Sequence, residues 1–355
     1  MAKVVVGMSG GIDSSVSAYL LKQEGFEVEG ISFILWEARN RSNFTTCCSL
    51  EAVNSASKTA GTLGITLESL DVREVFIEKV IEPFIDAYTR GLTPNPCILC
   101  NEYIKFPFLL REAEKRNAEF IATGHYARVE KIRDSGSEQC ALKKGLDTQK
   151  DQSYVLYRVR KEELEKLVLP LGDYLKTNVR DIARSVDLEA ADRQESQEIC
   201  FIEDKNYFKF IEKISPVAGE PGPIIDKQGT VLGAHRGIYC YTIGQRKGLG
   251  IASPEPYYVT KIDQAKNAIY VGLKEDAEIS KLFIENATWL FKPSSAVSKA
   301  TVKVRSMMKD KPATIEILDK GVNVTFDEPQ WAPAPGQSAV FYDGDIVIGG
   351  GIIAT

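Results

Sequence analysis

Apolar runs and amphipathic stretches alternate through the first two hundred residues of the chain. Short apolar runs predict buried strands, and apolar residues spaced three to four apart predict helices between them. The predicted strands are Lys3–Val6, Val28–Phe33, Ile65–Leu70 and Glu119–Thr123. The predicted helices are Ser14–Gln23, Ser49–Gly61, Val75–Tyr88 and Lys105–Arg116. This alternation indicates βαβ units and therefore an α/β fold built on a doubly wound parallel sheet.

The pattern changes after about residue 205. The stretch Ser215–Gly233 is dense in Pro and Gly, which is typical of a connector. From about Ile279 apolar and polar residues alternate with period two, as in Thr314–Leu318 and Val322–Phe326, which predicts a small all-β barrel or sandwich, and of the two we expect the barrel. The predicted division is therefore an α/β domain over 1–205, a small central domain over 206–278 and a C-terminal β-barrel over 279–355.

Composition excludes several classes of protein. The 355 residues carry 44 basic and 49 acidic side chains, and 44% are hydrophobic, which is ordinary for a folded globular chain. No apolar run approaches the roughly 20 residues that a bilayer requires, and the first apolar run ends at Gly7, too early for a secretory signal. We therefore expect a cytoplasmic protein with no membrane partner. Its seven cysteines are then better suited to thiol or metal chemistry than to disulfide bonds.

A glycine- and serine-rich loop follows the first predicted strand. It reads Ser9-Gly10-Gly11-Ile12-Asp13-Ser14-Ser15 and opens the next helix. Paired glycines let the backbone approach a ligand, and hydroxyls beside helix N–H groups attract an anion. A plain turn with Ser14 or Asp13 as N-cap is the alternative, but the combination of residues favours a phosphate-binding loop. The loop lacks the Gly-Lys-Ser/Thr ending of a Walker A motif.

Three cysteines lie in patterned segments. Cys97 and Cys100 form a CxxC pair beside two prolines, and Cys200 lies in Glu195–Phe201. A CxxC pair can be a redox site or half of a zinc site. The only other close pair, Cys47-Cys48, is adjacent and therefore poorly spaced to chelate zinc.

The glycine loop resembles the PP-loop of the ATP pyrophosphatases, which adenylate a carbonyl oxygen and release pyrophosphate. Nearly the whole chain is similar to one of their families, the tRNA-specific 2-thiouridylases. The other segments that carry this resemblance are Thr93–Asn101, Thr123–Arg128, Lys150–Tyr154, Glu195–Phe201 and Gly244–Gly250. The resemblance implies a tRNA-uridine 2-sulfurtransferase that uses ATP and Mg²⁺ to convert the wobble uridine of tRNA to 2-thiouridine. It also implies that the central domain binds tRNA.

The resemblance further implies roles for particular residues. ATP would be bound by Gly7, Met8, Ser9, Gly10, Gly11, Ile12, Asp13, Ser14, Phe33 and Gly124. The tRNA would contact Asn95, Pro96, Cys97, Lys150, Asp151, Gln152, Arg305 and Ser306. At the last position the family has tyrosine, so stacking by that ring is lost here. Cys200 would receive sulfur as a persulfide from a donor protein, and Cys100 would be the partner nucleophile, leaving a disulfide to be reduced.

Cys97 leaves the sulfur chemistry open, because many family members have aspartate there. Cys97, Cys100 and Cys200 could together ligate a [4Fe–4S] cluster with one iron free for hydrosulfide. We favour the persulfide relay because it requires no ligand geometry. An amide-forming ligase or a cytidine thiolase with the same loop, and an RNA-binding protein without turnover, are the rival functions.

Three further features have two interpretations each. Asp13 could help to hold Mg²⁺ or could cap the helix. His125 could line the nucleotide site or could be a hydrogen-bonded histidine at the end of a strand. The basic stretch Lys292–Lys311 could track phosphates or could be a solvated face.

Overall fold

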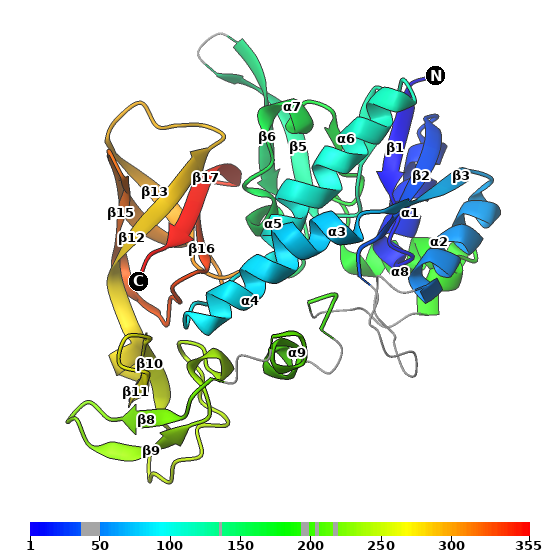
Figure 1. The fold of residues 1–355 in the computed structure, drawn as a ribbon. Coiled ribbons are helices and arrows are strands. Elements are labelled where there is room, and N and C mark those ends of the chain that lie inside the picture. The colour runs from blue at the N-terminus through cyan, green and yellow to red at the C-terminus, as the bar shows by residue number, and fades with distance from the viewer. Residues whose placement is uncertain (37–49, 135–136, 193–198, 203–205, 216–218) are drawn as a thin grey trace. The chain divides into compact units, whose positions relative to one another are not determined.

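The computed structural model describes residues 1–36, 50–134, 137–192, 199–202, 206–215 and 219–355 (Figure 1). Cys47, Cys48 and residues 195–198 of the Cys200 motif lie outside these ranges. The chain forms two compact units. Unit 1 comprises Met1–Val80, Pro96–Lys205 and Asp345–Val347, and unit 2 comprises Ile81–Asn95, Asn206–Gly344 and Ile348–Thr355.

A five-stranded parallel sheet forms the centre of unit 1. Its strand order is β3 (Thr66–Asp71), β2 (Glu27–Ile34), β1 (Lys3–Gly7), β4 (Phe120–Ala122) and β7 (Leu167–Val168). The predicted parallel sheet is confirmed, although the two-residue β7 was not predicted. Because β2 and β3 lie on one side of β1 and β4 lies on the other, the order of the strands reverses between β1 and β4. In such sheets ligands bind at the carboxyl ends of the strands at this reversal.

The helices α1 (Ile12–Gln23), α2 (Leu50–Leu63), α6 (Phe106–Lys115) and α8 (Lys176–Ser185) pack on the two faces of this sheet. The other helices of unit 1 are α3 (Arg73–Phe76), α5 (Pro96–Cys100) and α7 (Lys161–Leu164), with the short turns η2 (Asn101–Lys105), η3 (Ser153–Leu156) and η4 (Glu189–Asp192). Side chains alternate along β1. Val4 and Val6 join a core with Val16 of α1 and Val179 of α8. The opposite face of β1 meets Leu109 of α6, which lies near Gly7.

A hairpin of charged strands was not predicted. β5 (Ala127–Asp134) and β6 (Ser137–Lys144) pair antiparallel along their length. Both strands carry charged residues of either sign, for example Glu130 and Lys143, whose Oε2 and Nζ atoms lie 2.9 Å apart. Charged residues mask the apolar period that identifies a strand in a sequence.

Unit 2 contains a small sheet and a closed barrel. The small sheet has the order β10 (Tyr258–Asp263), β11 (Ala268–Gly272), β8 (Gly222–Ile225) and β9 (Val231–His235). The barrel has the order β12 (Glu278–Trp289), β15 (Gly321–Trp331), β14 (Lys311–Leu318), β13 (Val297–Lys303), β16 (Ser338–Asp343) and β17 (Ile346–Ile353). The remaining elements of this half are α4 (Glu82–Thr89), which follows the π-helical turn η1 (Ile77–Ile81), then α9 (Tyr207–Ile214), η5 (Ile238–Cys240) and η6 (Lys274–Ala277).

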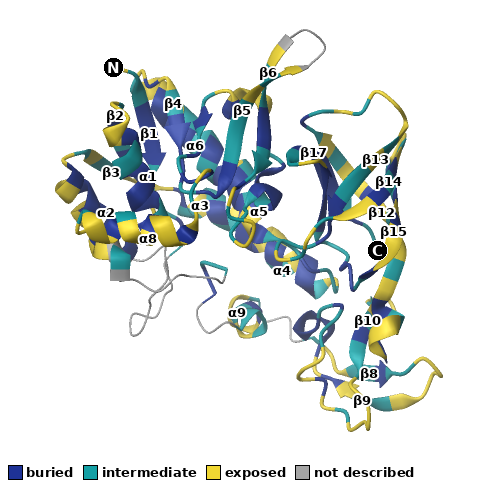
Figure 2. Cartoon of the chain, turned by 180° about the vertical axis from the view of Figure 1, so that it is seen from behind, coloured by how far each residue is buried: buried dark blue, intermediate teal, exposed yellow. Residues whose placement is uncertain are grey.

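Pairing of the first and last strands closes the barrel. Ile284 of β12 lies opposite Ile353 of β17 in an antiparallel register. Closure leaves no free strand edge to pair with another chain. Buried positions alternate with more exposed ones along much of β14 and β15, whereas β16 is buried over five successive residues (Figure 2). Ile315, Val324 and Phe341 lie in the core. The predicted C-terminal barrel is therefore confirmed.

Candidate active site

The loop between β1 and α1 has a backbone shape that requires glycine. Gly10 has φ +73°, and a Cβ at this residue would come 2.2 Å from the carbonyl oxygen of Ala52. The Ser55 hydroxyl donates a 3.0 Å hydrogen bond to the Gly10 carbonyl. The loop therefore lies directly against α2, which fixes its path.

Hydroxyl groups hold the loop to the first turn of α1. Ser14 Oγ accepts from the Ser9 N–H at 3.1 Å and donates to the Gly11 carbonyl at 3.0 Å. Gly11 is the N-cap residue and makes no side-chain cap. The first N–H groups of a helix have no acceptor within the helix and carry the positive end of its dipole, so this arrangement suits a phosphate group.

The loop after β4 contacts the same helix start. A Cβ at Gly124 would lie 2.8 Å from the backbone nitrogen of Ser14, so only glycine permits this approach. Phe33 lies near the carboxyl end of β2, opposite Leu70 of β3, and is half-buried. The structure thus brings the glycine loop and Gly124 together at the strand reversal.

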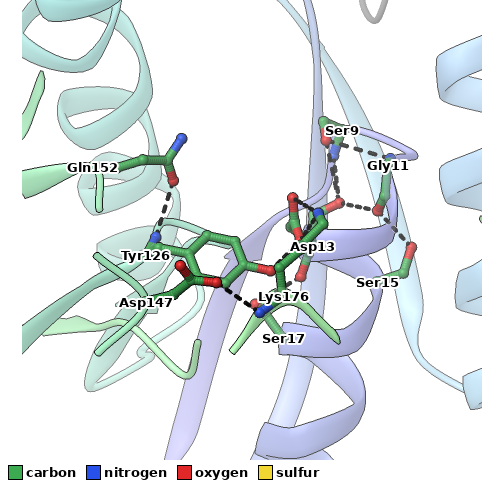
Figure 3. A network of polar contacts seen from close by, with 10 residues as sticks. Ser9, Gly11, Asp13, Ser15, Ser17, Tyr126, Asp147, Gln152 and Lys176 are labelled. Carbon is green, nitrogen blue, oxygen red and sulfur yellow. Dashed lines mark hydrogen bonds and ion pairs between the residues drawn. The ribbon is translucent and has the colours of Figure 1, made fainter. Parts of the chain in front are cut away.

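Asp13 makes polar contacts with two buried side chains (Figure 3). Its Oδ1 accepts from Lys176 Nζ at 2.7 Å and from the Tyr126 hydroxyl at 2.7 Å, and its Oδ2 lies 2.8 Å from Lys176 Nζ. The Lys176 side chain is only 8% exposed. The N-cap interpretation of Asp13 and Ser14 is wrong, because Gly11 is the N-cap. Lys176 was missed from the sequence, since no local pattern links residues so far apart in the chain.

Two residues expected to contact tRNA make internal hydrogen bonds. Asp151 Oδ1 accepts from the N–H groups of Gly145 and Ser153, both at 3.1 Å. Gln152 Oε1 accepts from the Tyr126 N–H at 3.0 Å. These hydrogen bonds therefore help to fix the shape of the segment that contains Asp151 and Gln152.

Cys97 and Cys100 lie on one short helix. α5 begins at Pro96, so the helix starts earlier than the predicted Lys105, and it continues through the π turn η2 into α6. Proline suits the first position of a helix, where its missing N–H costs no hydrogen bond. Residues three apart lie on the same side of a helix. Cys97 is exposed, whereas Cys100 is 5% exposed.

The π turn after Cys100 is anchored to η3. Asn101 Nδ2 donates to the Val155 carbonyl at 3.0 Å. Glu102 Oε2 accepts from Arg158 Nη1 at 2.9 Å. These contacts fix the position of Cys100 relative to the segment that precedes η3, which contains Lys150, Asp151 and Gln152.

Cys200 lies on an anchored turn. The Ile202 N–H donates to the Ile199 carbonyl at 3.0 Å, and Phe201 packs edge-on against Phe76 of α3 with ring centroids 5.8 Å apart. Cys200 itself is partly exposed. Within the part of the chain that the structure describes, no three His, Cys, Asp or Glu side chains are grouped as a metal site.

His125 is a buried, uncharged histidine at the end of β4. Its Nδ1 lies 2.8 Å from the Thr123 hydroxyl, and the residue is 8% exposed. Burial, and then the positive charge of Lys105, hold the pKa of His125 well below its usual value. The hydrogen bond agrees with the interpretation of His125 as a histidine at the end of a strand, and its role in the nucleotide site stays a prediction.

Arg305 holds parts of unit 2 together. Its Nη2 donates to the carbonyl oxygens of Ile243 at 2.9 Å and Ala332 at 2.6 Å. Its guanidinium carbon lies 5.8 Å from the centre of the Trp331 ring. Ser306, the next residue, is half-buried. Arg305 therefore has a structural role whether or not it also contacts RNA.

A glycine loop at the strand reversal, two thiols on a helix of the same unit and a closed β-barrel define a nucleotide-binding α/β protein with an appended barrel. Three family descriptions match nearly the whole chain. They are the tRNA methyl transferase HUP domain over residues 2–204, the tRNA methyl transferase PRC-barrel domain over 208–273 and the aminomethyltransferase beta-barrel domain over 279–353. In the described residues, no helix is both long enough and apolar enough to cross a membrane.

Relatives that match over nearly their whole length identify the family of this chain. The chain is 47% identical to "tRNA-specific 2-thiouridylase MnmA 1" of Caldanaerobacter subterraneus subsp. tengcongensis, covering 99% of this chain and 97% of the relative. It is 44% identical to "tRNA-specific 2-thiouridylase MnmA" of Clostridioides difficile, covering 99% and 98%. The chain therefore belongs to the MnmA family of tRNA-specific 2-thiouridylases. It also resembles a 4-thiouridine synthetase–RNA complex with bound ATP at a TM-score of only 0.39 and 17% identity, over 61% of this chain and 50% of that one.

Proposed function

We propose that this protein is a tRNA-uridine 2-sulfurtransferase that replaces the C2 oxygen of the wobble uridine with sulfur at the expense of ATP. The observation that carries the proposal is the meeting of the glycine loop and Gly124 at the strand reversal, in the same unit as Cys100 and Cys200. The phosphate-binding loop would hold the ATP that activates the C2 oxygen, and the thiols would deliver the sulfur that attacks C2. Membership of the thiouridylase family supports joining the two in one reaction.

The glycine loop would bind ATP. Residues Gly7 to Ser14 would hold the phosphates, with Phe33 and Gly124 beside the adenosine. The C2 oxygen of uracil would attack the α-phosphate and displace pyrophosphate. Backbone N–H groups of the loop would stabilise the charge that develops on the phosphates. Mg²⁺ would be bound through the phosphates, because the carboxylate of Asp13 already accepts from Lys176.

Adenylation makes the C2 oxygen a good leaving group, since it departs as part of AMP. In the relay that we propose, a donor protein first loads Cys200 with sulfur as a persulfide. The terminal sulfur of the persulfide attacks C2, and the C2–oxygen bond breaks as AMP leaves, so that this sulfur links C2 to the Cys200 sulfur. Cys100 attacks Cys200 to free that sulfur, and the resulting Cys100–Cys200 disulfide is reduced by a cellular thiol. A [4Fe–4S] cluster held by Cys97, Cys100 and Cys200 is the alternative sulfur carrier.

We further propose which parts of the chain contact the tRNA. Asn95, Pro96 and Cys97 would contact the target base, and Lys150, Asp151 and Gln152 would contact the tRNA backbone. Arg305 and Ser306 would add a contact in the barrel. The functional division would be a catalytic domain over 1–205, a tRNA-binding module over 206–278 and the barrel over 279–355.

Nucleoside mass spectrometry tests the proposal. Unmodified tRNA is incubated with purified protein, ATP, Mg²⁺ and a persulfide or sulfide donor, once aerobically and once anaerobically after iron–sulfur reconstitution. We expect 2-thiouridine in both arms, and its loss in Cys100→Ser and Cys200→Ser variants that still bind ATP. Product only in the reconstituted arm would replace the relay by the cluster. No product in either arm, with donor and tRNA verified on a control enzyme, would contradict the function and favour an amide-forming ligase.

A further inference from the structure

Two hydrogen-bonded connections join the segment Gly145–Ser153 to the glycine loop, and both reach Asp13 (Figure 3). One runs through Lys176 and the other through Tyr126. All of these residues belong to unit 1. The loop is also held against α2 through Gly10, so these two connections are not the only contacts that fix its path.

The first connection runs through Asp147. Its Oδ2 accepts the backbone N–H of Lys176 at 3.0 Å, at the start of α8. Its Oδ1 accepts the N–H groups of Gln149 and Lys150, at 3.1 and 3.3 Å. One carboxylate therefore both shapes the turn that presents Lys150 and holds the helix end from which Lys176 reaches Asp13. A shift of this turn would move the Lys176 ammonium relative to Asp13.

The second connection runs through Gln152. Its side chain accepts the Tyr126 N–H at 3.0 Å, and its own N–H donates to the Tyr126 carbonyl at 2.8 Å. Tyr126 is 3% exposed, and its hydroxyl donates to Asp13. A Cβ at Gly145 would come 2.8 Å from the Tyr126 carbonyl oxygen, so the segment packs closely along this residue. The backbone of residue 126 therefore moves with residue 152.

A movement of the Gly145–Ser153 segment would affect ATP through Asp13. Its carboxylate lies in the first turn of α1, where the phosphates of ATP would bind. An unpaired carboxylate would repel a triphosphate, whereas Lys176 neutralises it. The Lys176 side chain is 8% exposed and the Asp13 side chain is 34% exposed, so the pair lies at the edge of the solvent, and a displacement of Lys176 would change the charge that Asp13 presents to the phosphates.

We propose that Lys176 and Tyr126 are positioning residues through which tRNA bound on Gly145–Ser153 sets Asp13 and the ATP loop for adenylation. This proposal rests on the proposed function, since it assumes that tRNA contacts Lys150. ATP would bind without tRNA, but its α-phosphate would be attacked rapidly only when the segment is held by tRNA. The expected signature is a large stimulation of pyrophosphate release by tRNA that depends on contacts remote from the RNA.

The test measures pyrophosphate release with and without unmodified tRNA, together with the dissociation constants of ATP and tRNA. Tyr126→Phe removes one hydroxyl at the far end of the network, and Asp147→Ala removes the anchor of Lys176. We expect the stimulation by tRNA to fall about fivefold to tenfold in each variant, because each loses a hydrogen bond to or from a charged group. For Tyr126→Phe both dissociation constants should stay within twofold of wild type. Asp173→Ala is the matched control, since that carboxylate is 78% exposed and lies just before α8.

A double-mutant cycle tests whether Lys176 acts through Asp13. Lys176→Met and Asp13→Asn should each lower tRNA-stimulated release, and the double variant should be no worse than the poorer single variant. Additive losses would show that Lys176 acts on the phosphates directly and would overturn the proposal. Undiminished stimulation in Tyr126→Phe and Asp147→Ala would also overturn it while leaving the thiolation function intact. No stimulation in the wild-type enzyme would overturn the positioning role, and thiolation would then be judged by 2-thiouridine formation alone.

Discussion

Gly124 lies so close to the start of α1 that a Cβ on it would come within 2.8 Å of the backbone nitrogen of Ser14. This contact joins the loop after β4 to the loop after β1. The two loops are separated by more than a hundred residues in the chain, yet they form one surface at the strand reversal. The proposed nucleotide site is therefore shaped by backbone packing as much as by side chains.

A methyl group at residue 124 should damage ATP binding. In Gly124→Ala the Cβ meets backbone atoms that cannot rotate away, so the helix start must shift, at a cost of about 1–3 kcal/mol. We expect the dissociation constant for ATP to rise at least tenfold, measured by calorimetric titration. Gly61→Ala is the matched control, because a Cβ there meets nothing within 4 Å in α2. That variant should bind ATP normally and be more stable by about 0.5–1 kcal/mol.

A substitution at Cys97 distinguishes the persulfide relay from the mechanism that uses a [4Fe–4S] cluster. Cys97→Asp introduces the residue that many family members have. Under the relay, thiolation should stay within about threefold of wild type, because only Cys100 and Cys200 exchange sulfur. Thiolation measured as 2-thiouridine per tRNA is the readout, with Cys140→Ser as the control thiol substitution. A loss of product as complete as in Cys200→Ser would instead make Cys97 a required ligand or nucleophile.

Stability should depend on pH through His125. Its pKa is lowered in the folded protein, chiefly by burial, so protonation favours the unfolded chain. The free energy of unfolding should fall as pH drops below about 6.5, the ordinary pKa of histidine, by up to about 1.4 kcal/mol per pH unit. Urea denaturation of wild type and His125→Asn at pH 7.5, 6.5 and 5.5 measures this contribution. Parallel pH curves for the two proteins would contradict the prediction.

Arg305 should matter more for stability than its exposed neighbours do. Arg305→Ala removes two hydrogen bonds from a charged donor to backbone carbonyls, and we expect a loss of about 2–4 kcal/mol in the free energy of unfolding. Lys309→Ala is the control, because that side chain is exposed in the same loop. It should leave the melting temperature unchanged. If this loop contacts tRNA, the slope of log K against log salt falls by about one in the lysine variant.

The sequence predicted those parts of unit 1 whose signals are local. The valine run of β1 and the double glycine after it were sufficient to place the loop, and Gly25 marked the end of α1. The hairpin β5–β6 was missed because its solvent-facing charges hide the apolar period. The early start of α5 was missed because two prolines suggested a turn, although Pro96 is the first helical residue.

The buried network of Asp13 could not be predicted for a different reason. The pairing with Lys176 joins residues from α1 and α8, and its formation depends on how these helices pack over the sheet. An aspartate in a phosphate loop suggests a metal ligand or a cap when it is seen alone. Only tertiary structure supplies the ammonium that changes its role.

The π turn η2 has a consequence for how the thiols are aimed. A π turn accommodates one residue more than an α-helical turn, and η2 lies between Cys100 and the firmly packed helix α6. Deleting one residue from Asn101–Lys105 would restore regular α-helix and leave the rotation of α5 about its axis almost unchanged, because the π turn absorbs that residue. Deleting one residue from the regular helix α6 would instead rotate α5 by about 100° about its axis. Cys97 and Cys100 would then point in a different direction while every strand of the sheet stayed in place. The direction in which the two thiols point thus depends on the rotation of helix α5 about its axis, independently of the sheet.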